Sequence, residues 1–156
     1  EFKLNKTPLN KTTYGAIEEE LKTLNLEANP RNIADAVINI RKRKLPNPSE
    51  IGNSGSFFKN PIISTERFEE LQKKFPNIVG YKMVDTETKV AAGWLIDNAG
   101  LKGYRKGDAG VHKNQALVLV NYNNASGQDI INLSELVQEI ILEKYGISIE
   151  AEVNFI

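Results

Sequence analysis

The sequence lacks cysteine altogether, and in 156 residues it has one histidine, one methionine and one tryptophan. Without cysteine the chain forms no disulfide, offers no thiolate nucleophile and holds no metal through sulfur. His112 alone cannot build a site that needs several histidines, so we expect no metal site. No apolar run approaches the roughly 20 residues that a membrane helix requires, and no signal peptide opens the chain. We therefore expect no membrane partner.

The chain also lacks an excess of charge of either sign, because 20 Lys and Arg residues balance 20 Asp and Glu residues. A chain without an excess of positive charge has little to hold nucleic acid, so we expect no nucleic-acid partner. The alternative is a nucleic-acid binder that uses the one dense basic cluster, Arg41–Lys44, together with Phe57 and Phe58. That cluster ends an expected helix, where the helix dipole favours cations. Binding of a phosphate is the alternative role.

Helices and strands are predicted to alternate along the chain. Apolar residues at helical spacing and capping residues predict helices over 17–24, 30–44, 64–75, 91–98 and 126–146. Shorter apolar runs predict strands over 57–63, 79–84, 117–120 and 147–155, with a small-residue loop over 52–56 and a polar turn over 85–88. With no repeat and no low-complexity linker, we expect one compact α+β domain with a mixed or antiparallel sheet packed against helices.

Ser56 ends the small-residue loop and is the first candidate for chemistry. Such a serine can bond to its own backbone in a turn, or its hydroxyl can be held exposed where glycines let a ligand approach. A Ser-His-Asp triad with His112 is possible from composition, but the spacing does not support it. Gly103, Gly107 and Gly110 are spaced wrongly for a nucleotide-binding fingerprint.

Glu152 is the second candidate and lies on the polar face of the expected last strand. Ile147, Ile149 and Val153 alternate there with polar residues, which is typical of a half-buried strand. An exposed edge carboxylate is one interpretation. The other is a partly desolvated carboxyl group that shares or donates a proton.

Several segments, taken in order, resemble the signatures of the UDP-N-acetylenolpyruvoylglucosamine reductase (MurB) family, and the similarity covers essentially the whole chain. The matching segments are Arg41–Pro46, Gly52–Pro61, Ala91–Asp97, Leu101–Gly103, Val111–Leu119 and Glu150–Val153.

The resemblance implies that residues 1–156 are the C-terminal substrate-binding domain of a flavin-dependent reductase. Residues 1–13 would be the end of the preceding region. The only methionine is Met83, so we expect a fragment that lacks the FAD-binding domain. FAD and NADPH would serve the full-length enzyme, and we expect neither cofactor on this fragment and no activity from it alone. The family's reaction reduces the enolpyruvyl ether of UDP-N-acetylglucosamine, an early cytoplasmic step in bacterial peptidoglycan synthesis on which cell shape and division depend.

The resemblance also implies roles for single residues. Ser56 matches the serine that protonates the substrate, and Glu152 matches the glutamate that helps to stabilise the enol-type intermediate. The residues that match substrate-holding positions are Tyr14, Lys44, Asn60, Tyr81, Lys102 and Gln115. Cations and amide donors suit a substrate that carries a diphosphate and a carboxylate.

Two positions depart from the family pattern. Ala151 stands where proline commonly precedes the final glutamate, and Asp108 adds a negative charge to a loop expected near an anionic ligand. The alternative function is a stand-alone module that binds a sugar nucleotide without catalysis.

Overall fold

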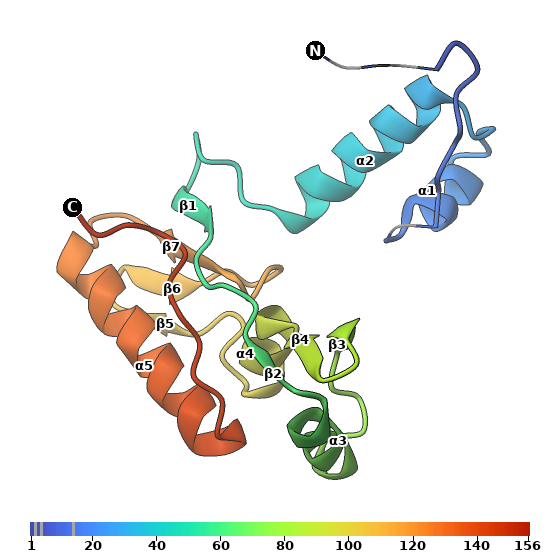
Figure 1. Ribbon diagram of the computed structural model, residues 1–156. Helices are drawn as coiled ribbons and strands as arrows, with labels where there is room; N and C mark the ends of the chain where they lie inside the picture. Colours follow the sequence, from blue (N-terminus) through green and yellow to red (C-terminus); the bar gives the residue numbers. More distant parts are fainter. Residues whose placement is uncertain (2, 4, 14) are drawn as a thin grey trace. The chain divides into compact units, whose positions relative to one another are not determined.

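The structure is a computed structural model that describes residues 1–156 except residues 2, 4 and 14. The chain divides into two compact units, residues 1–45 and 46–156. The expected α+β class is confirmed, because five helices and two antiparallel sheets make up the described part of the chain (Figure 1).

The first unit contains two helices, α1 (Ile17–Thr23) and α2 (Pro30–Lys44). The side chain of Asn29 accepts a hydrogen bond from the N–H of Asn32 at 2.9 Å, and Pro30 fills the first helical position as predicted. Arg43 holds Glu20 through both carboxylate oxygens, and this hydrogen bonding lowers the pKa of Glu20. A small apolar core joins the helices, formed by Ile17, Leu21 and Ala36.

The second unit contains a four-stranded antiparallel sheet in the order β1-β7-β6-β5. These strands are β1 (Gly52–Ser56), β5 (Arg105–Lys106), β6 (Ala109–Val111) and β7 (Val118–Asn121). Helix α5 (Gly127–Tyr145) packs against β6 and β7, and the C-terminal segment runs back beside α5 to reach the end of β1 (Figure 1).

A smaller antiparallel sheet, in the order β2-β4-β3, occupies another part of this unit. Its strands are β2 (Ile62–Ser64), β3 (Gly80–Val84) and β4 (Glu87–Val90). Helix α3 (Thr65–Lys74) packs on β2 and β4, and helix α4 (Ala92–Asn98) follows β4 directly.

The ends of α5 are set by its sequence. Ser126 and Asp129 form a capping box, in which the N–H of Asp129 donates to the Ser126 hydroxyl and the N–H of Ser126 donates to the Asp129 carboxylate. Gly146 ends the helix with φ of +64°, a conformation that glycine adopts at little cost. Both features were predicted. The buried face of α5 contributes Leu133, Val137, Ile141 and Tyr145 to the main core.

Several details differ from the prediction. Residues 52–56 form strand β1 rather than a loop, and β4 begins at Glu87, inside the polar turn expected over 85–88. The strand expected over 57–63 does not form as one element, because Phe58 makes only an isolated bridge and β2 begins at Ile62. The expected last strand is reduced to one isolated bridge between Phe58 and Ala151, although Ile147 and Ile149 are buried as its alternation predicted. Backbone pairing depends on distant partners that the local pattern does not reveal.

Among the described residues, no helix combines the length and the apolar character needed to cross a membrane.

Candidate functional site

Strand β1 contains a bulge immediately before Ser56. Asn53 pairs with Val120 and Ser56 pairs with Val118, so two residues of β1 lie opposite the single residue Leu119. The N–H of Gly55 turns back to the side-chain oxygen of Asn53 at 3.1 Å, and Gly55 has φ of +78°. A bulge of this kind redirects the chain locally and is common beside functional sites. Ser56 is exposed at the end of this bulge.

The C-terminal segment pairs with the residues that follow Ser56. Phe57 donates its N–H to the Leu117 carbonyl at 2.7 Å and accepts the N–H of Glu152 at 2.8 Å. Lys59 donates its N–H to the Glu150 carbonyl at 2.9 Å. The backbone of Glu152 therefore lies beside the residue next to Ser56, although the two candidates are far apart in the sequence. The Glu152 side chain is exposed.

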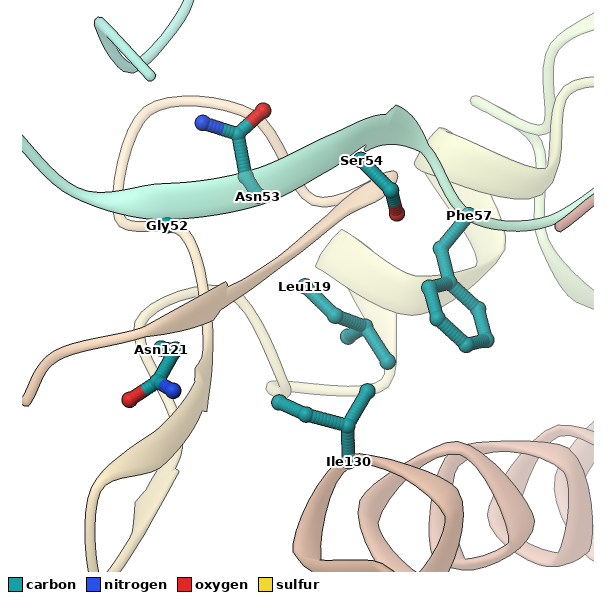
Figure 2. A pocket seen from close by; sticks show the side chains of 7 residues that line it. All are labelled: Gly52, Asn53, Ser54, Phe57, Leu119, Asn121 and Ile130. Carbon is teal, nitrogen blue, oxygen red and sulfur yellow. The ribbon is translucent and has the colours of Figure 1, made fainter. Parts of the chain in front are cut away.

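One cavity of about 210 Å³ lies between β1 and the start of α5 (Figure 2). In this view the Ser54 side chain points to the side of β1 where Phe57 and Leu119 lie, and the Asn53 side chain points to the other side. The apolar side chains of Phe57, Leu119 and Ile130 line the cavity, together with Gly52, Asn53, Ser54 and Asn121. The site is thus bounded on one side by an apolar hollow directly beneath the bulge.

A second cavity, of about 260 Å³, lies beside the paired segments 58–59 and 150–151. Lys59 and Glu150 line it and form an ion pair with 3.5 Å between Nζ and Oε2. Both side chains are exposed, so the pair contributes little to stability and leaves the ammonium available to an anion. Asn60, Pro61, Ile62 and Ser148 complete the lining of this cavity.

Asn60 has a structural contact that the sequence did not reveal. Its side-chain oxygen accepts the N–H of Ala92 at 2.9 Å and so caps the first turn of α4, whose own N-cap residue, Ala91, has no side chain to do so. The oxygen of the Asn60 amide is therefore engaged, and its NH₂ group is the donor that a ligand would meet at the cavity.

Tyr81 lies on β3, one of the two edge strands of the smaller sheet, with 58% of its surface exposed. Gly80 before it is tightly enclosed, because an added Cβ would lie 2.4 Å from the Phe68 ring and 2.9 Å from Thr88. The strand is thus fixed at Gly80 while the phenol of Tyr81 faces solvent.

Lys102 and Gln115 are each held by a neighbour. Lys102 forms an ion pair with Asp97 at the end of α4, and both side chains are partly exposed. The side-chain oxygen of Gln115 faces the N–H of Leu117 at 3.5 Å, and the same oxygen lies 3.8 Å from where a Cβ on Gly93 of α4 would be.

The remaining expected substrate residues belong to the first unit. Lys44 is exposed at the last position of α2, beside Arg41, Lys42 and Arg43. Tyr14 lies outside the described residues.

His112 and Asp108 have structural contacts of their own. Burial, with a smaller contribution from Lys113, lowers the pKa of His112, and its Nδ1 accepts the N–H of Asn114 at 3.4 Å. Asp108 forms an ion pair with Arg105 at 2.8 Å and accepts the N–H of Asn124 at 3.0 Å. The negative charge of Asp108 is therefore balanced within its own loop.

The glycines at 103, 107 and 110 have different surroundings. Gly107 lies in the turn between β5 and β6, and an added Cβ on Gly110 would lie 2.6 Å from the Tyr122 ring. Among the described residues, no group of three acidic, cysteine or histidine side chains is placed to hold a metal ion.

Comparison with known proteins matches the second unit of the chain to one domain of a known family. Residues 47–156 match the family model described as UDP-N-acetylenolpyruvoylglucosamine reductase, C-terminal domain. The matched residues are nearly the whole second unit, with the bulge, the two cavities and the C-terminal segment. The class is therefore that of reductase C-terminal domains.

Two relatives that align with almost the full chain identify its family. A protein named UDP-N-acetylenolpyruvoylglucosamine reductase from Flavobacterium johnsoniae is 58% identical over 93% of this chain and 43% of its own length. One with the same name from Pseudomonas syringae pv. tomato is 45% identical over 98% of this chain and 45% of its own length. A crystal structure of MurB from Thermus caldophilus is 27% identical, covers 80% of this chain and 33% of that chain, and has a TM-score of 0.49. The chain belongs to the UDP-N-acetylenolpyruvoylglucosamine reductase family.

The chain spans less than half the length of these curated relatives.

Proposed function

We propose that residues 1–156 are the substrate-binding and proton-donating part of a UDP-N-acetylenolpyruvoylglucosamine reductase. Residues 1–13 would end the preceding region, and the reaction would be a cytoplasmic step of peptidoglycan synthesis in a bacterium. The observation that carries the proposal is the arrangement at Ser56: the hydroxyl follows a glycine with positive φ in a bulge, and the next residue is hydrogen-bonded to the backbone of Glu152.

FAD and NADPH would bind the part of the reductase that this chain does not span. When bound, the flavin supplies the hydride. The role of this chain is to hold the enolpyruvyl sugar nucleotide and to deliver a proton from the Ser56 hydroxyl to the substrate carbon next to the carboxylate. A hydroxyl is a weak acid in water, so the developing charge must be stabilised by neighbouring groups, and Glu152 has that role.

We assign substrate binding to the six side chains that the resemblance implies. Lys102, Asn60, Gln115 and Tyr81 belong to residues 46–156, and Lys44 and Tyr14 belong to residues 1–45. Lysine holds a phosphate as a point charge, which suits a diphosphate substrate.

The test replaces Ser56 by alanine in the complete reductase. Flavin reduction by NADPH is expected to proceed normally, and reoxidation by the enolpyruvyl substrate is expected to slow by orders of magnitude, because only the second half-reaction needs the proton. Ser54→Ala is the matched control, since it removes an exposed hydroxyl from the same strand. Normal substrate reduction by the Ser56 variant would remove the serine from the mechanism. A stand-alone binding module would bind the sugar nucleotide with no flavin domain encoded upstream in frame.

A further inference from the structure

The C-terminal segment is held differently before and after Glu152. Before this residue, Ala151 makes the isolated bridge to Phe58, and at Glu152 itself the backbone N–H donates to the Phe57 carbonyl at 2.8 Å. After it, no backbone hydrogen bond fixes residues 153–156 within the part of the chain that the structure describes. The course of the chain beyond Glu152 therefore depends on the packing of side chains.

Phe155 joins this end of the chain to the core. Its ring centroid lies 6.1 Å from that of Phe57, with an angle of 50° between the two ring planes. Phe57 also meets Phe58 edge to face, with 5.1 Å between the centroids. Ring pairs at such separations attract each other beyond the burial of their surface. Phe155 is 56% exposed and Phe57 is 3% exposed, so an outer ring is held on a buried one.

Phe57 connects the ring of Phe155 to both candidates for chemistry. It directly follows the candidate serine, and its carbonyl accepts the N–H of Glu152. Because Phe58 and Ala151 form an antiparallel bridge, the adjoining residues Phe57 and Glu152 lie opposite each other. Opposite residues share a face, with Cβ atoms about 5 Å apart. The side chain of Glu152 therefore leaves the backbone on the face where Phe57 receives the ring of Phe155.

The Glu152 carboxylate is directed by its backbone alone. Among the described residues it takes part in no ion pair, and its side chain is exposed. The backbone at this position is fixed on one side by hydrogen bonds. On the other side it is fixed by Val153, which packs half-buried against the main core, and by the ring of Phe155. Removal of that ring frees the backbone on one side of the carboxylate and leaves the hydrogen bonds in place.

We propose that Phe155 is a positioning residue for the reaction and acts through Glu152. Its ring, packed on Phe57, keeps the chain beyond Glu152 in the course that aims the carboxylate at the substrate. The proposal rests on the proposed function, in which Glu152 stabilises the enol-type intermediate, and adds to it a residue that acts without touching the substrate.

The test compares Phe155→Ala with Ile156→Ala in the complete reductase. Ile156 is the matched control, because it is the next residue and its side chain is fully exposed. Phe155→Ala is expected to slow reoxidation of the flavin by the enolpyruvyl substrate roughly ten- to hundredfold, because a misplaced group costs rate. The accompanying change in KM is expected to stay below about twofold. Phe155→Tyr keeps the ring and is expected to retain most of the rate, and Ile156→Ala is expected to leave it unchanged.

Combination with Glu152→Gln shows whether the ring acts through the carboxylate. Two residues that act as a unit have non-additive effects, so the double variant Glu152→Gln/Phe155→Ala is expected to be no slower than Glu152→Gln alone. Losses that multiply in the double variant, or a normal rate in Phe155→Ala, would overturn the role of Phe155 while slow Ser56→Ala and Glu152→Gln variants leave the proposed function intact. Full activity of those two variants would overturn the proposed function and this role with it.

Hydrogen exchange separates positioning from a loss of structure. The N–H of Glu152 is expected to stay protected from exchange with deuterium in Phe155→Ala, because its bond to the Phe57 carbonyl is made by the main chain. Exchange of this amide at the rate of an unfolded segment would show that the ring only keeps the segment folded, and would overturn the positioning role.

Discussion

Glu152 donates its backbone N–H to the carbonyl of Phe57 at 2.8 Å, and this bond connects the C-terminal segment to the residue that follows Ser56. The contact is made by the main chain, so it holds the segment in place whatever the side chain at 152 does. A substitution at position 152 can therefore change the chemistry of the side chain without breaking the backbone hydrogen bond that holds the segment.

Glu152→Gln tests that separation. The free energy of unfolding is expected to change by less than about 0.5 kcal/mol, as for most exposed substitutions, while turnover of the complete reductase falls by orders of magnitude. Urea unfolding and steady-state kinetics measure the two effects. Glu150→Gln is the control, since it removes only an exposed ion pair with Lys59. Full activity in Glu152→Gln would mean that the carboxylate has no part in the reaction.

Substitution of Gly55 tests whether the bulge positions Ser56. At φ of +78°, and with nothing within 4 Å of an added Cβ, the penalty for another residue is conformational and not steric. Gly55→Val is expected to cost about 1–2 kcal/mol and to lower turnover, while Gly55→Asn, which tolerates the left-handed region, keeps most of both. Thermal unfolding and kinetics distinguish the variants. If valine and asparagine behave alike, the positive φ is not what holds the serine.

Gly80 offers a test of packing under Tyr81. Alanine there brings Cβ within 2.6 Å of two atoms of the Phe68 ring, so we expect a loss of about 1–3 kcal/mol in the free energy of unfolding. Gly127→Ala is the comparison, because the first turn of α5 has open space at that position, and it is expected to be neutral or up to about 1 kcal/mol more stable. Equal stability of the two variants would show that β3 moves freely away from Phe68.

Tyr145 makes stability depend on pH at the alkaline end. Burial raises the pKa of this phenol from 10.0 to about 12, and its hydroxyl donates to Asn98 at 2.8 Å. The folded state keeps the proton after the unfolded chain has lost it, so the stabilisation is complete below pH 10 and is lost as the pH rises toward 12.

Tyr145→Phe is expected to remove about 1 kcal/mol below that range, and the difference from wild type should shrink within it. Urea unfolding at a series of pH values measures this difference. Tyr104→Phe, at an exposed phenol, provides the control. A constant difference between wild type and Tyr145→Phe across the range would mean that the phenol titrates equally in both states.

The helices were predictable because their signals are local. Asn29 with Pro30, Ser126 with Asp129, and Gly146 each act on the neighbouring turn, and the structure has the helix ends that they predicted. The strands were less predictable, because segment 147–155 shows strand alternation but makes only one bridge, at Ala151.

The candidate site shows the same division. Ser56 and Glu152 were found by the resemblance and by their places in glycine-rich and alternating segments. The Asn60 contact to α4 had no local signal, because it depends on residues that only the folded chain brings together.

The bond between Asn60 and Ala92 makes the start of α4 sensitive to whatever occupies the adjoining cavity. A molecule that draws the Asn60 amide toward itself leaves the Ala92 N–H exposed to solvent, and one that locks the amide in place protects it. The rate at which this single amide proton exchanges with deuterium is therefore a reporter of occupancy that the protein carries in its own backbone.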